Sequence, residues 1–163
     1  MLSELERNIL EILSEDARRH VKQIAVMTGA GEDEVRQAIA KLERDRIIIK
    51  YPAMINWDRV RDDIVQALIE VKVTPQRDEG FDVIAQKIYS FDEVKSCYLM
   101  SGAFDLLVIV EGTNIKQTAL FVAEKLSTLE NVLSTATHFV LKKYKQDGAI
   151  VESGYEDDRL SIS

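Results

Sequence analysis

The chain has 163 residues, of which 46% are hydrophobic and 30% are charged, and it carries a net charge of −7 at pH 7. This composition is typical of a folded globular protein and argues against a disordered or fibrous chain. One cysteine cannot form an internal disulfide, and two histidines with one thiol are too few for a zinc finger, so we expect neither a metal nor a cofactor. No apolar run approaches the roughly 18 residues of a membrane span, and the N-terminus does not resemble a signal peptide, so we expect a cytoplasmic protein.

Three helices are expected within the first 46 residues. Ser3 followed by Glu6 is a capping-box signal, and apolar residues at helical spacing continue to about residue 15. A second, short helix is expected over residues 21–27. A third begins after the turn at residues 28–31 and ends near Arg46.

Three residues in this segment have the spacing of a helix-turn-helix. Ala25 allows two helices to approach closely, Gly29 provides the positive φ of the turn, and Val35 anchors the second helix. Residues 47–51 are rich in β-branched and aromatic side chains, which predicts a short strand, or wing. Residues 1–56 are therefore predicted to form a winged-type helix-turn-helix DNA-binding domain. The alternative is a plain three-helix packing module.

The third helix provides the candidate DNA contacts, because the N-terminal and outward residues of a recognition helix face the bases. Gln37 suits an adenine edge and Arg36 a guanine edge. The predicted base-facing set is Glu32, Asp33, Arg36, Gln37 and Ala40, and the predicted phosphate-contacting set is Arg18, Arg19, Lys22, Lys41 and Arg44. The alternative for the second set is an ordinary solvated helix face. Since residues 1–60 have a net charge of −1 and residues 32–34 are all acidic, we expect weak DNA binding by a monomer.

The second part of the chain alternates strand and helix patterns after a charged linker at residues 57–63. Strands are expected at residues 64–73, 94–100, 106–110 and 132–141. The intervening helices are expected to bury Phe81, Ile84, Ala85 and Ile88 in the first, and Ile115, Ala119, Val122 and Leu126 in the second. The order βαββαβ predicts a ferredoxin-like domain over residues 64–146, and so an α+β chain. The acidic residues 147–163 are expected to be a mobile tail or an interaction arm.

The strand at residues 106–110 predicts an assembly. Its five consecutive apolar residues place aliphatic side chains on both faces of the sheet, whereas the helices cover only one face. A homodimer would cover the other face and would also pair two recognition helices. The alternative is that the linker or the tail covers this face.

The helix-turn-helix, the βαββαβ order and two segments of the second domain together carry a resemblance to a known family. The link between the second and third strands reads Ser101-Gly102-Ala103-Phe104-Asp105, and its last four residues resemble the Gly-x-aromatic-Asp signature of Lrp/AsnC (feast/famine) transcription regulators. Residues 132–141, with their threonines, are similar to the last strand of that family. Phe104 stands where tyrosine is commoner, and the acidic start of the third helix departs from the hydroxyl- and arginine-rich pattern of many members. The resemblance covers nearly the whole chain.

This resemblance implies a sequence-specific DNA-binding regulator with a C-terminal ligand-sensing (RAM) domain. Such proteins dimerise, assemble into octamers or larger rings, bind promoter DNA and respond to a small effector, often an amino acid, held between subunits near that hairpin. The Gly102 amide could bind a carboxylate and Asp105 an ammonium group. The candidate effector-binding residues are Ser101, Gly102, Ala103, Asp105, Thr135 and Thr137. The alternative is local: a turn glycine, a carboxylate that caps backbone amides, and threonines that merely suit a strand.

Other classes of function find little support. The sequence has no Gly-rich phosphate loop, no metal-ligand spacing and no nucleophile motif, so we do not expect an enzyme. Cys97, His20 and His138 are expected to be structural or surface residues. The remaining rival is a stand-alone amino-acid-binding or oligomerisation module that does not bind specific DNA.

Overall fold

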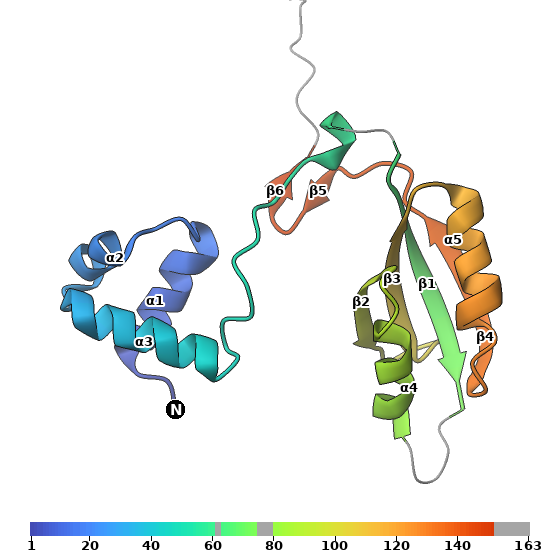
Figure 1. Ribbon diagram of the computed structural model, residues 1–163, viewed down its shortest axis with the longest axis horizontal. Coiled ribbons are helices and arrows are strands. Elements are labelled where there is room, and N and C mark those ends of the chain that lie inside the picture. Colours follow the sequence, from blue (N-terminus) through green and yellow to red (C-terminus); the bar gives the residue numbers. More distant parts are fainter. Residues whose placement is uncertain (61–62, 75–79, 152–163) are drawn as a thin grey trace, which may run out of the picture. The chain divides into compact units, whose positions relative to one another are not determined.

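The computed structural model describes residues 1–60, 63–74 and 80–151 (Figure 1). The chain divides into two compact units, with the boundary between Ile55 and Asn56. Within the described residues, no helix combines the length and apolar character needed to cross a membrane.

The first unit consists of three helices: α1 (Glu4–Glu15), α2 (Val21–Thr28) and α3 (Glu32–Arg44). The predicted capping box starts α1, because the Glu6 amide donates to Ser3 Oγ and the Ser3 amide donates to Glu6 Oε2. The helix-turn-helix spacing is confirmed. Ala25 is 7% exposed, Gly29 has φ 71°, and Val35 is fully buried. The core of this unit consists of Ile9, Ile24, Ala25, Val35 and Leu42.

The predicted wing strand at residues 47–51 is wrong, because this segment forms no strand in the structure. Arg46 adopts φ 59° and ends the helix, and the amides of Ile47 and Ile48 both donate to the Leu42 carbonyl, at 2.9 and 3.0 Å. The chain then runs on without a neighbouring strand, and Ile49 is 70% exposed. β-branched residues favour a strand only where a partner strand is available to pair with them.

The second unit has the predicted βαββαβ order. Its elements are β1 (Val65–Val73), α4 (Gly80–Tyr89), β2 (Val94–Leu99), β3 (Leu106–Gly112), α5 (Ile115–Phe121) and β4 (Val132–Phe139). The four antiparallel strands lie in the order β2-β3-β1-β4, and α4 and α5 lie on the same side of this sheet (Figure 1). The alternating residues of β1 from Ala67 to Val73 are buried beneath the helices, as expected. The ferredoxin-like fold is confirmed.

The predicted inner face of the last helix is partly wrong. Ile115 is 57% exposed and Ala119 is also exposed, whereas Thr118 is buried. The buried set is Thr118, Phe121, Val122 and Leu126. The reason is a π-helical turn, η2 (Val122–Leu126), which continues α5 and changes the residue spacing that faces the sheet.

The ends of the second unit also differ from the predicted boundaries. A small hairpin, β5 (Lys145–Gln146) and β6 (Ala149–Ile150), crosses the expected end at residue 146. Its turn has φ 44° at Asp147 and 84° at Gly148, as a two-residue hairpin turn requires. Asn56 Nδ2 donates to the Val151 carbonyl at 2.9 Å, and the single turn η1 (Trp57–Arg59) follows it in the predicted linker. The rest of the predicted linker includes residues 61–62, and most of the predicted tail is residues 152–163; both segments lie outside the described residues.

Candidate functional site

The residues predicted to face DNA bases lie on the solvent side of α3. Successive helical residues are rotated by about 100°. The side of α3 opposite the buried residues Val35 and Leu42 therefore carries Asp33, Gln37, Ala40 and Arg44. Arg36 lies on one flank. All the predicted base-facing residues are exposed: Glu32, Asp33, Arg36, Gln37 and Ala40.

The predicted phosphate-contacting residues differ in their partners. Arg18 Nε lies 3.1 Å from Asp16 Oδ1 and Arg19 Nε 3.6 Å from Asp16 Oδ2, and the Arg18 guanidinium lowers the pKa of the Asp16 carboxyl. Arg44 Nε lies 3.6 Å from Asp45 Oδ1. Because all these basic groups are exposed, such pairs are weak and a phosphate could compete for them. Lys22 on α2 is exposed as well.

Lys41 has a different environment from the other basic residues of the first unit. Its Nζ lies 2.5 Å from Glu6 Oε1 on α1, and the Glu6 side chain is only 6% exposed. The Lys41 hydrogen bond, followed by the one from the Ser3 amide, lowers the pKa of the Glu6 carboxyl. Sequence reasoning identified both residues but assigned Lys41 to phosphate, since nothing local indicates an ion pair 35 positions apart.

The predicted effector hairpin ends β2 and begins β3. Ser101, Gly102 and Ala103 are exposed, and Gly102 has φ 145°, a value that favours glycine. Asp105 Oδ2 accepts the Val73 amide at 2.9 Å, and the Asp105 amide donates to the Val71 carbonyl at 3.1 Å. The Asp105 carboxylate therefore joins the hairpin to the end of β1 through one of its two oxygens. The local alternative expected it to cap amides of the hairpin itself, whereas the amide that it accepts belongs to β1.

The two predicted effector threonines lie on β4, on the other side of β1. Thr135 pairs with Val71 and Thr137 with Ile69, which places both on the helix-covered face. Thr135 Oγ1 lies 3.3 Å from Ser127 Oγ. Thr135 and Asp105 both flank the same end of β1, but strands β3 and β4 are two strand spacings apart, about 10 Å. Within one chain, the threonines and the hairpin therefore do not form a compact cluster.

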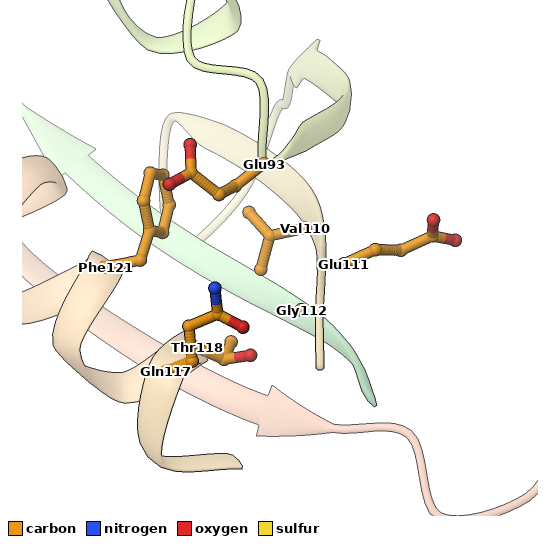
Figure 2. A pocket seen from close by; sticks show the side chains of 7 residues that line it. All are labelled: Glu93, Val110, Glu111, Gly112, Gln117, Thr118 and Phe121. Carbon is orange, nitrogen blue, oxygen red and sulfur yellow. The ribbon is translucent and has the colours of Figure 1, made fainter. Parts of the chain in front are cut away.

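A small hollow lies at the opposite end of β3 and was not predicted from the sequence. It is lined by Glu93, Val110, Glu111, Gly112, Gln117, Thr118 and Phe121, and Figure 2 shows the Glu111 side chain directed away from it. Its empty volume of about 180 Å³ is partly open to solvent. Because this figure includes open solvent, the space that the hollow encloses is smaller still, well below the ~300 Å³ at which small-molecule sites usually begin. Gly112 is required here, because a Cβ at this position would lie 2.6 Å from Thr118 Oγ1.

Two further side-chain contacts of the second unit, one of them an ion pair, join residues that the sequence did not connect. Lys125 Nζ lies 2.7 Å from Glu93 Oε1 and 5.7 Å from the centroids of both the Phe91 and the Phe121 ring. The Lys125 hydrogen bond lowers the pKa of Glu93. On the sheet, His138 Nε2 lies 3.2 Å from Glu70 Oε1.

The face of the sheet without helices carries a band of apolar side chains, as predicted. Ile109 pairs with Leu68, and Leu107 pairs with Tyr98, so these residues share that face. Tyr98 is 51% exposed, and the other three are half-buried. The remaining residues of the predicted five-residue run lie beneath the helices and are fully buried or nearly so: Leu106, Val108 and Val110.

Comparison with known proteins identifies the family. Residues 66–150, a little over half of the chain, match the family model described as the Lrp/AsnC ligand binding domain. The chain belongs to the Lrp/AsnC family. It is 50% identical to YugG of Bacillus subtilis, described as an uncharacterized HTH-type transcriptional regulator, over 99% of this chain and 98% of that protein. Members of this family are transcriptional regulators, and this chain is one of them.

Solved Lrp/AsnC structures have the same fold along almost the whole chain. The leucine response regulatory protein LrpA of Mycobacterium tuberculosis has a TM-score of 0.78 at 20% identity, and the match covers 93% of this chain and 100% of that one. The regulator NMB0573 of Neisseria meningitidis, solved as a complex with L-Met, has a TM-score of 0.71 at 24% identity and covers 90% and 94% of the two chains.

Proposed function

We propose that this Lrp/AsnC regulator binds double-stranded DNA through α3 as a homodimer, and that a small effector, an amino acid, controls this binding. The observation that carries the proposal is the α2–turn–α3 arrangement, whose core residues are buried while its polar and basic side chains remain exposed. A protein that acts on promoter DNA in this way works in the cytoplasm.

The base-reading side chains are Arg36 and Gln37. A guanidinium can donate two hydrogen bonds to guanine, and a carboxamide can pair with adenine. Glu32 and Asp33 at the start of α3 can accept hydrogen bonds from cytosine amino groups, which makes an acidic helix start compatible with base reading. Ala40 allows close approach of the helix. Lys22, Arg18, Arg19 and Arg44 supply phosphate contacts at the rim.

The open face of the sheet is the dimer interface. Leu68, Tyr98, Leu107 and Ile109 form a continuous apolar band that a second copy can cover by two-fold symmetry. A two-fold dimer presents two recognition helices to two half-sites, which compensates for the low positive charge of each first unit. The resemblance further suggests that dimers assemble into octamers or larger rings. Analytical ultracentrifugation measures the number of subunits in the assembly.

The effector is an amino acid bound near the hairpin at residues 101–105. The NMB0573 complex with L-Met supports this ligand class. The exposed hairpin offers backbone amides for a carboxylate, and Asp105 keeps one carboxylate oxygen that β1 does not use. Because β1 separates this hairpin from Thr135 and Thr137 within one chain, residues from a neighbouring subunit complete the site.

The Asp105→Asn variant separates the two roles of Asp105. Its amide oxygen can still accept the Val73 amide, whereas the charge that would bind an ammonium group is lost. We expect the free energy of unfolding of Asp105→Asn to stay within about 1 kcal/mol of that of the wild type. In calorimetry with the common amino acids at millimolar concentration, we expect this variant to give no heat of binding. Asp105→Ala should lose both the hydrogen bond from the Val73 amide, and with it stability, and the binding of the amino acid. If wild type gives no heat with any amino acid, the effector proposal is wrong.

Gel-shift measurements with genomic fragments test the DNA-binding proposal. Wild type should retard a subset of fragments in the presence of competitor DNA, and Arg36→Ala and Gln37→Ala should reduce this selectivity. Amino-acid binding without retardation of any fragment would instead support the stand-alone ligand-binding module.

A further inference from the structure

Glu6 is a buried carboxylate with both oxygens occupied. Oε2 accepts the Ser3 amide at 2.8 Å in the capping box, and Oε1 accepts Lys41 Nζ at 2.5 Å. The side chain of Glu6 is 6% exposed, whereas that of Lys41 is 47% exposed. A carboxylate in this position would lack a charged partner if Lys41 turned toward a phosphate, and leaving a buried charge unpaired is costly.

The position of Lys41 on α3 agrees with this pairing. Lys41 is five residues beyond Arg36, which places the two side chains about 140° apart around the helix axis. Arg36 lies beside the surface that faces DNA in the proposed function, whereas Lys41 lies on the flank that contacts the start of α1. Arg44, one turn later, is directed away from the buried residues Val35 and Leu42.

We infer that Lys41 is a positioning residue, which fixes the recognition helix α3 against α1 through Glu6 and makes no phosphate contact. This inference rests on the proposed DNA-binding function. The pair joins the first turn of α1 to the last turn of α3. It therefore limits rotation of α3 about its own axis, and such a rotation would redirect Arg36 and Gln37 together.

The salt dependence of DNA binding distinguishes a positioning residue from a phosphate contact. Each lost phosphate contact flattens the slope of log affinity against log salt by about one. Lys41→Met keeps the aliphatic stem and removes the charge, and Arg44→Met is the matched control on the same helix. With the 163-residue chain, well below its melting temperature, we expect Lys41→Met to weaken binding by roughly tenfold with an unchanged slope. Arg44→Met should flatten the slope, and Lys41→Arg should restore most of the affinity.

A double-mutant cycle with Glu6→Gln tests the pair itself. If Lys41 acts through Glu6, the combined Glu6→Gln and Lys41→Met variant binds DNA no more weakly than either single variant. A flatter slope for Lys41→Met, an unchanged affinity, or additive losses would each overturn the inference. Hydrogen exchange of residues 1–15 and 32–44 supplies a readout without DNA: both single variants should exchange faster in both segments. If wild type fails to bind any DNA, the proposed function is wrong, and hydrogen exchange still decides whether the pair holds the two helices together.

Discussion

A charged substitution is expected to have opposite effects at two neighbouring positions of β3, because their side chains lie on opposite faces of the sheet. Val108 is fully buried beneath the helices, whereas Ile109 is half-buried on the open face beside Leu68. Val108→Asp places a charge inside the core of the single chain and should prevent folding of the second unit. Ile109→Asp should leave each chain folded, because its side chain reaches solvent in the monomer, but should prevent dimerisation.

The magnitude follows from the symmetry of the interface and from the groups around Ile109. An isologous dimer carries the substitution twice. The charged residues nearest to Ile109 on the open face, Glu70 and Glu111, are acidic and would repel the new carboxylate, whereas His138 lies one strand farther away, beside Leu68. At about 3 kcal/mol for each buried unpaired charge, the dimer loses about 6 kcal/mol, or roughly a 10⁴-fold increase in dissociation constant.

Sedimentation equilibrium at micromolar concentration measures this change, with circular dichroism as the check on folding. Leu120→Asp is the matched control, since Leu120 is an exposed aliphatic residue on α5, away from the open face. We expect Leu120→Asp to remain dimeric and Ile109→Asp to be monomeric. A dimer of Ile109→Asp with the wild-type dissociation constant would refute the assignment of this face.

Two further predictions concern stability. Because the folded-state pKa of Glu6 lies below its ordinary value of 4.5, its ionised form stabilises the fold above that pH, and this contribution is lost as pH falls through the folded-state pKa. Wild type should therefore be more stable than Glu6→Gln at pH 7, and thermal melts should show the difference shrinking below pH 4.5; a constant difference would contradict this reasoning. Gly112→Ala should destabilise the second unit by about 1–3 kcal/mol, because its Cβ would meet Thr118 Oγ1, and adding Thr118→Ala should recover part of that loss in chemical denaturation. Full additivity of the two changes would argue against this contact.

Local patterns explain why much of the fold was predictable. The capping box at Ser3 and Glu6, the turn glycine Gly29 and the alternation along β1 each depend on residues a few positions apart. The prediction of a wing strand at residues 47–51 was wrong because strand formation depends on a partner strand that the local sequence does not reveal. The predicted set of buried residues on α5 was partly wrong because a π-helical turn interrupts the normal helical spacing.

The candidate sites were predictable only as far as they are local. The exposed face of α3 and the hairpin at residues 101–105 follow from nearby residues, and the structure places both at the surface, while their binding roles stay predictions. The pairing of Lys41 with Glu6 and of Asp105 with the Val73 amide depends on contacts between residues 35 and 32 positions apart, respectively. No local pattern distinguishes these structural partners from free ligand-binding groups.

Selection of bound sequences from a pool of random double-stranded DNA tests the central claim most directly. The wild-type chain should enrich a two-fold symmetric motif whose half-sites lie a whole number of helical turns apart, about 10 base pairs per turn. Gln37→Ala should lose the preference at one position of each half-site while retaining the spacing. Recovery of only random sequences by wild type, with and without the common amino acids, would contradict a sequence-specific DNA-binding function for this chain.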